Sequence, residues 1–244
     1  PLHAAHQPAT PFHRWQVGEP LPHFAQLQVS GPTPAKGRIA LLIGNDDYDE
    51  GSGFHPLSKC RNDARGMAQT LQGMGFDVNT LLDATNKQFR DALHDFVERI
   101  QDSYVAVLLF SGHGQAFGNS NYLVPTGVTT SLDREDDFEH ACINLNNILG
   151  TFNRRAPSTS TVCIFLDCCR SDPKNEAFKG VGSPHNGFLK SPSAAAPAAT
   201  TGSPKPSMVI GYATAPGTVA TTRGGGQYSP YTHALMQHLP TRRK

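Results

Sequence analysis

Two short motifs bring together the residue types that nucleophilic catalysis by a thiol requires. Ser111-Gly112-His113-Gly114 follows one apolar run, and Asp167-Cys168-Cys169-Arg170 follows another. A thiol near its reference pKa of about 8.5 is only partly ionised at neutral pH, and a neighbouring imidazole raises the thiolate share. The same imidazole can then protonate the leaving amine. The motifs therefore predict a catalytic pair of His113 and one cysteine of the tandem.

The glycines beside His113 have a possible role of their own. Gly112 would permit a sharp exit from the preceding strand. Gly114 has no side chain, so its backbone N–H can approach a reacting carbonyl. Together with the N–H of the nucleophile, it could stabilise an oxyanion.

The five cysteines do not have the spacing of a disulfide framework or of a zinc site. Their odd number and irregular spacing argue against disulfides, and no His/Cys run has zinc-ligand spacing. Cys163 reads as a small buried hydrophobe, and Cys60 and Cys142 are interpreted in the same way. An isolated histidine at a strand end is also more often structural than catalytic. We expect reduced thiols and a cytoplasmic location.

The pattern of apolar residues predicts strands that alternate with helices. Short apolar runs predict five strands, at 39–43, 76–82, 104–110, 161–166 and 207–212. Helical spacing predicts four helices, at about 62–74, 85–100, 145–152 and 230–238. Thr85 and Gln88 form a capping box, and Ser229-Pro230 starts the final helix. This alternation predicts an α/β fold with a mostly parallel sheet and helices on both faces.

The predicted order of elements also suggests where the site lies. The carboxyl ends of strands in open parallel sheets are where ligands and catalytic groups gather. If the strands at 104–110 and 161–166 are neighbours, His113 and a cysteine of the second motif lie across one cleft.

Composition divides the chain into an arm, a domain and an insert. Residues 1–36 are punctuated by proline and predict an arm, and residues 37–240 form the domain. A flexible insert is expected at about 172–206, because its low-complexity part cannot bury enough apolar surface to offset its ordering entropy. The insert carries Lys174, Lys179, Lys190 and Lys205, so it is a candidate for self-cleavage, with a passive spacer as an equal alternative.

The overall charge excludes some partner classes. The formal net charge is +1, which gives no bias toward nucleic acid or an anionic membrane. No stretch reaches the ~18 apolar residues of a membrane span. Protein or peptide substrates are expected, and an oligomer is left open. Because the first residue is proline, we expect a fragment or a processed form.

The combined motifs resemble those of the caspase-like peptidases, a group that includes caspases, paracaspases and metacaspases. The resemblance is carried by RIALLIGN at 38–45, CRNDARGMAQTLQGMGF at 60–76, VLLFSGHG at 107–114, FLDCCRS at 165–171 and GYATAPG at 211–217. It is nearest to paracaspases, because Arg170 follows the cysteine where metacaspases usually carry His. The resemblance implies a three-layer sandwich in which His113 is the base. It implies that Cys169 is the nucleophile, since the family places Asp two residues before it, and leaves Cys168 without a catalytic role.

The resemblance also suggests a substrate class. Paracaspases and metacaspases use acidic residues to hold Arg or Lys at P1, and Asp63 and Asp167 match two of these acids. The structural alternative is that Asp63 is an acid in the first turn of a helix, where the helix dipole favours negative charge. The matching stretch for a third acid, Gly217-Thr218-Val219-Ala220, has none. The expected function is a cysteine endopeptidase cutting after Arg or Lys. The alternatives are an Asp-specific caspase and a catalytically silent scaffold that binds partners.

Calcium is the one cofactor that the resemblance raises. Metacaspases commonly need calcium, and this chain has an acidic run that offers oxygen ligands: Asp133, Glu135, Asp136, Asp137 and Glu139. However, Val124-Pro125-Thr126-Gly127 lacks the Asp that metacaspases place after this proline. We therefore expect a solvated acidic loop and no cofactor, with calcium as the alternative.

Overall fold

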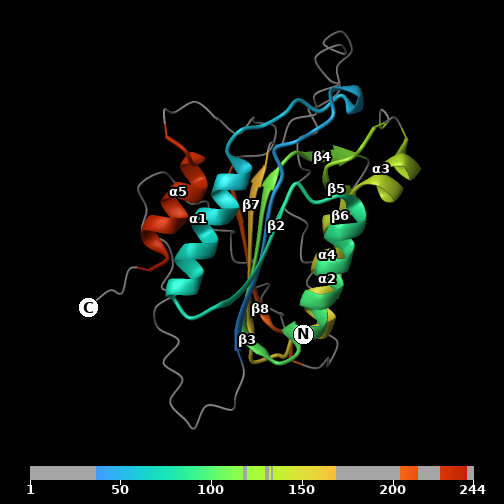
Figure 1. The fold of residues 1–244 in the computed structure, drawn as a ribbon. Helices are drawn as coiled ribbons and strands as arrows, with labels where there is room; N and C mark the ends of the chain where they lie inside the picture. The colour runs from blue at the N-terminus through green and yellow to red at the C-terminus, as the bar shows by residue number, and fades with distance from the viewer. Residues whose placement is uncertain are drawn as a thin grey trace, which may run out of the picture. The chain divides into compact units, whose positions relative to one another are not determined.

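A five-stranded parallel sheet forms the centre of the described structure. The computed structural model describes residues 37–117, 120–129, 132, 134–168, 204–213 and 226–240. The strand order is β2-β1-β3-β7-β8 (Figure 1). The strands are β1 (Gly37–Gly44), β2 (Asp77–Leu82), β3 (Ser103–Gly112), β7 (Thr161–Cys168) and β8 (Ser207–Tyr212). All neighbouring pairs run parallel, as the unbroken apolar runs predicted. The predicted arm and most of the predicted insert lie outside the described residues.

Helices cover both faces of this sheet. Helices α1 (Cys60–Gly73) and α5 (Pro230–His238) lie on one face, and α2 (Asn86–Ile100) and α4 (Leu145–Arg155) lie on the other (Figure 1). Successive strand residues point to opposite faces. Leu41 packs with the α2 and α4 side chains, whereas Leu42 packs with those of α1 and α5. The predicted α/β sandwich is confirmed.

Three of the helices begin at a residue whose side chain caps the first turn. Thr85 caps α2, and both hydrogen bonds of the predicted capping box with Gln88 are present. Ser229 caps α5 by accepting from the Thr232 N–H, and Pro230 occupies the first turn. Asn144 caps α4 in the same way, through the N–H groups of Asn146 and Asn147.

A small antiparallel sheet was missed in the sequence. It consists of β4 (Gly114–Phe117), β5 (Ser120–Leu123) and β6 (Ile143–Asn144), in that order. Its strands have two to four residues, too few to display a period-2 pattern, and none carries a continuous apolar run. A 3₁₀ turn at Glu50–Ser52 was also missed.

The acidic run forms a helix rather than the expected loop. Helix α3 (Glu135–Ala141) begins within it, while Asp133 lies outside the described residues. Three acids occupy the first turn of α3, where the helix dipole favours negative charge. The fully buried Phe138 anchors the helix, stacking on Phe117 with ring centroids 4.9 Å apart. The loop prediction was wrong because one apolar anchor is too weak a signal in a stretch of charged residues.

A third apolar cluster joins the segment after β1 to the small sheet. Tyr48 and Phe54 from this segment pack with Tyr122, Val124 and Phe138. This packing brings residues 46–57 against the turn that carries His113.

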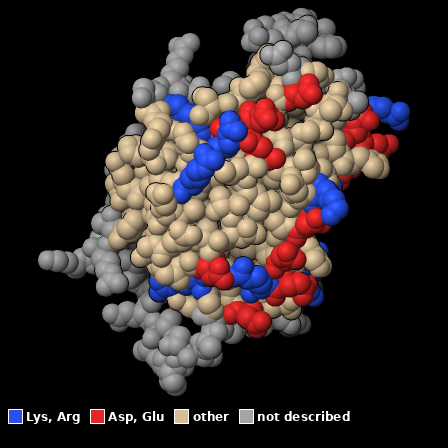
Figure 2. All heavy atoms as spheres, viewed as in Figure 1, with Lys and Arg blue, Asp and Glu red and all other residues tan. Residues whose placement is uncertain are grey.

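Basic and acidic side chains are not segregated on the face drawn in Figure 2. None of the helices in the described ranges is long and apolar enough to cross a membrane. Basic and acidic side chains lie beside one another in Figure 2. Arg155 pairs with Glu98, and Arg99 pairs with Asp77.

Candidate active site

The two motifs predicted to be catalytic leave the sheet side by side. Strands β3 and β7 are neighbours, and their last paired residues are Gly112 and Cys168. His113 is the next residue after Gly112. The expected neighbour relation of the two strands is confirmed, so both motifs start from the same edge of the sheet. Cys169 itself lies outside the described residues.

Cys168 lies inside the core. It is 2% exposed and belongs to the apolar cluster that packs under α2 and α4. Cys60, Cys142 and Cys163 are likewise buried, and burial raises the pKa of each of these three thiols. Buried thiols with a raised pKa are poor nucleophiles.

The surroundings of His113 favour a neutral imidazole. Its ring is half-buried and lies edge-on to the Tyr48 ring, with centroids 4.5 Å apart. Burial lowers the pKa of His113, which favours the uncharged ring at neutral pH. His113 Nε2 lies 2.7 Å from the carbonyl oxygen of His55. Because a carbonyl can only accept, we assign the proton to Nε2, which leaves the lone pair of Nδ1 to act as a base.

Gly114 begins β4 and has its backbone N–H turned away from β5. The Val124 N–H donates to the His113 carbonyl at 3.0 Å, so His113 and Val124 form a hydrogen-bonded pair. Gly114 pairs with Leu123, the next pair along the ladder. In an antiparallel ladder the next pair does not exchange hydrogen bonds. The Gly114 N–H is therefore directed away from the ladder, as oxyanion stabilisation requires.

Gly112 is required for a reason other than the one expected. Strand β3 extends to Gly112, which is not among the described glycines with positive φ. A Cβ atom at this position would lie 2.6 Å from Tyr48 Oη and 2.7 Å from Phe110 Cζ. The close approach of these two rings, rather than a sharp turn, explains the glycine.

The two predicted pocket acids lie close together and are buried. Asp63, in the first turn of α1, is fully buried, and Asp167, near the end of β7, is 6% exposed. The Ser229 N–H donates to Asp63 Oδ1 at 2.8 Å, and the Ser229 hydroxyl donates to Asp167 Oδ2. Ser229 thus bridges the carboxylates. Ser111 Oγ also donates to Asp63 at 3.0 Å, and Thr232 Oγ1 donates to Asp167 at 2.7 Å.

The electrostatics of this pair favour a cation. Burial and, to a smaller extent, the nearby charge of Asp167 raise the pKa of Asp63 to about 6, although the Ser229 N–H acts in the opposite direction. Two buried carboxylates need compensating charge. Within the described residues, neither carboxylate forms an ion pair with Lys or Arg. A guanidinium or ammonium group would complete the site.

Several residues around the site were not found in the sequence. Tyr48 and His55 lie in a segment without a periodic pattern, so no signal could have placed them beside His113. Ser229 was recognised only as a helix cap, and its contact with both acids depends on how α5 packs against α1 and β7. The prediction of Asp63 and Asp167 came from family motifs.

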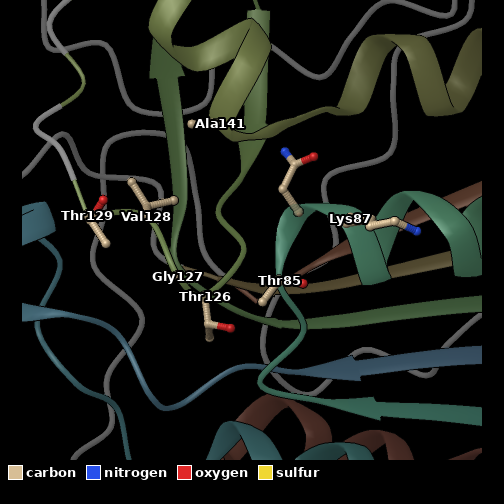
Figure 3. Close-up of a pocket in the computed structure, with 8 residues that line it drawn as sticks. Thr85, Lys87, Thr126, Gly127, Val128, Thr129 and Ala141 are labelled. Carbon is tan, nitrogen blue, oxygen red and sulfur yellow. The ribbon is translucent and has the colours of Figure 1, made fainter.

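A surface pocket of about 300 Å³ is formed by residues other than His113, Asp63 and Asp167. It is formed by the start of α2 and by the loop after β5, with Thr85 opposite Thr126 and Gly127 (Figure 3). The amine of Lys87 points away from this loop (Figure 3). None of the predicted site residues lines this pocket.

The acidic helix supplies no metal cluster in the described part of the chain. No group of three His, Cys, Asp or Glu side chains is placed to hold an ion there. Glu139 Oε1 instead accepts from the Tyr122 hydroxyl and from Asn144 Nδ2, both at 2.7 Å.

Comparison with known proteins shows which family the chain resembles. A family model described as "Caspase domain" matches residues 37–244. The chain is 32% identical over 138 residues to human Mucosa-associated lymphoid tissue lymphoma translocation protein 1, covering 56% of this chain and 15% of the relative. The mouse homolog is 30% identical over 152 residues, covering 62% of this chain and 17% of the relative. The chain thus spans less than a fifth of either relative.

Proposed function

This chain belongs to the caspase domain family, nearest in motif to the paracaspases, and from that premise we propose that it is a cysteine endopeptidase cutting protein chains after Arg or Lys. Cys169 attacks the scissile carbonyl, and its thiol proton passes to Nδ1 of His113. The protonated His113 then gives this proton to the leaving amine. Water hydrolyses the thioester that remains. The N–H groups of Gly114 and Cys169 bind the oxyanion.

The bridged carboxylates of Asp63 and Asp167 carry the proposal of basic specificity. Both lie buried beside the strand that leads to His113, and their hydrogen bonds come from hydroxyl and N–H groups rather than from a cation. A P1 Arg or Lys would supply the missing positive charge. An Asp side chain at P1 would meet two like charges, which disfavours an Asp-specific caspase.

A panel of reporter amides with Arg, Lys or Asp at P1 tests this function. We expect hydrolysis of the Arg and Lys reporters and none of the Asp reporter. Cys169→Ala should abolish it, while Cys163→Ala, a change at a buried thiol, should retain it. Preference for the Asp reporter would overturn the pocket assignment. Full activity of Cys169→Ala would overturn the mechanism.

Thiol labelling separates an enzyme from a silent scaffold. An arginyl substrate analogue with a thiol-reactive group should label Cys169 far faster than Cys163, whose pKa is raised to about 11 by burial. Equal labelling would favour a scaffold that acts by binding partners.

We propose that catalysis needs no metal ion and takes place in the cytoplasm, where thiols stay reduced. The reporter assay in calcium and in EGTA tests the first point. Equal rates are expected, and a rate that depends on calcium would point to the acidic helix α3.

A further inference from the structure

The hydroxyl of Tyr48 lies between His113 and Val124. Tyr48 is 3% exposed. The backbone N–H of His113 donates to Tyr48 Oη at 3.0 Å, and Tyr48 Oη donates to the carbonyl oxygen of Val124 at 3.1 Å. Burial raises the pKa of Tyr48 well above its ordinary value, so the phenol keeps the proton that it donates.

This position lies at the end of the antiparallel ladder of β4 and β5, one pair beyond its first strand residues. Gly114 pairs with Leu123, and the pair before it is His113 and Val124. A hydrogen-bonded pair in such a ladder exchanges two bonds. One is present, from the Val124 N–H to the His113 carbonyl at 3.0 Å. The reciprocal bond is replaced by the two bonds through Tyr48. The phenol hydroxyl thus stands at the end of the ladder, between the His113 N–H and the Val124 carbonyl.

Tyr48 is itself held firmly. The Asp46 carbonyl accepts from the N–H groups of Tyr48 and Leu57, at 3.1 and 2.9 Å. Asp83 Oδ1 accepts from the N–H groups of Asp46 and Asp47, at 2.8 and 2.9 Å. The segment that carries Tyr48 is therefore anchored at both its ends.

The same segment also holds the imidazole of His113. The His55 carbonyl accepts from Nε2, and the Phe54 ring lies 5.3 Å from the imidazole centroid. One segment thus contacts both the backbone and the side chain of His113. The backbone contact is made by the hydroxyl of Tyr48.

We propose that Tyr48 is a positioning residue for His113: its hydroxyl, which bridges His113 and Val124 at the end of the β4–β5 ladder, fixes the position of the imidazole. The inference rests on the proposed function. Without the hydroxyl, the His113 N–H and the Val124 carbonyl either lose a buried partner or close onto each other, and both outcomes move His113.

Tyr48→Phe tests this role, because it removes the hydroxyl and keeps the ring. We expect kcat for the arginyl reporter to fall roughly 10- to 100-fold, since a displacement of about 1 Å at a catalytic group can have that effect. KM should stay nearly unchanged, because Asp63 and Asp167 are untouched. The matched control is Tyr122→Phe, which removes another buried tyrosine hydroxyl, one bonded to Glu139. It should leave kcat unchanged.

A second readout does not depend on activity. The ¹⁵N shifts of the His113 ring, assigned with His113→Ala, report which nitrogen carries the proton. The native chain should show the Nε2–H form, and Tyr48→Phe should show a mixture, because the bond to His55 loosens. Tyr122→Phe should match the native chain. If the native chain cleaves no reporter but Tyr48→Phe shifts this tautomer, the proposed function fails and the positioning role stands.

Gly112→Ala displaces the same hydroxyl by a different change. Its Cβ would press on Tyr48 Oη and on Phe110 Cζ, so we expect a fall in kcat and a tautomer mixture like those of Tyr48→Phe. This variant decides the matter if Tyr48→Phe does not fold, as judged by thermal unfolding. Native kcat and a native tautomer in a folded Tyr48→Phe protein would overturn the proposal.

Discussion

Asp63 is a carboxyl group that keeps its proton to a higher pH than usual, whereas the proposed substrate needs it ionised. Its pKa is raised from 3.8 to about 6 by burial and by Asp167. Four hydrogen bonds from Ser111, Ser229 and Thr232 hold the two acids in place. As pH rises, the stability of the fold should therefore decrease while binding of an Arg or Lys substrate improves.

The first prediction concerns stability. Between about pH 4 and pH 6 the native state holds a proton on Asp63 that the unfolded chain has released. The stability contributed by this carboxyl is therefore present at low pH and is lost as pH rises to 6. A pKa shift of about two units limits this decline in the free energy of unfolding to about 3 kcal/mol. Asp63→Asn should remove the decline. Urea unfolding at pH 4 and pH 7 measures it. Asp77→Asn, at an exposed site, is the control, and a native-like decline in Asp63→Asn would contradict the prediction.

The second prediction concerns substrate binding. Protonated Asp63 cannot pair with a guanidinium, so KM for the arginyl reporter should rise as pH falls below about 6. Asp63→Asn should raise KM roughly 10- to 100-fold at pH 7, the value of one charge-assisted hydrogen bond. Its remaining pH dependence of KM should be small. A KM that does not change between pH 5 and pH 7 in the native chain would argue against Asp63 as a ligand for P1.

At the scale of elements, the helices and strands with strong local signals were predicted and the small ones were missed. The apolar runs predicted β1, β3 and β7, and the capping box predicted the start of α2. The β4–β5 hairpin, which holds the His113 turn, has four-residue strands and no such signal. Its Tyr122 and Phe117 side chains pack in the cluster that contains Tyr48 and Phe138 of α3, contacts that come from distant parts of the chain.

The capping box of α2 allows a direct test at this scale. Thr85→Ala should lower the free energy of unfolding by about 1 kcal/mol, because the Gln88 N–H loses its acceptor. Thr85→Ser keeps the hydroxyl and should lose much less. Neither change should alter kcat, since Thr85 lies outside the proposed site. Equal unfolding midpoints for Ala and Ser in chemical denaturation would show that the cap contributes little.

At the scale of the whole described domain, the sheet is buried on both faces. Leu41 and Leu42 are adjacent on β1 and each is 0% exposed, yet they belong to different clusters. The two helix layers therefore contribute separately to stability. The proposed site lies where strands β3 and β7 end between these layers.

Truncating each of these leucines should show that both layers matter. Leu41→Ala and Leu42→Ala should each lower the free energy of unfolding by about 2–5 kcal/mol, the usual range for a leucine removed from a packed core. Guanidinium unfolding measures both. A loss below about 1 kcal/mol for Leu42→Ala would mean that α1 and α5 cover the sheet only loosely.

The sequence by itself determined the parallel sheet, its helices and the identity of His113 as a candidate base, because apolar periodicity, capping residues and the GHG motif are local properties. Family motifs pointed to Asp63 and Asp167, but not to the serine between them. Only the tertiary structure decided that Ser229 bridges these acids and that Tyr48 stands between His113 and Val124. These contacts join residues 62 to 166 positions apart in the chain. No local pattern encodes such contacts, because they depend on how separate elements pack together.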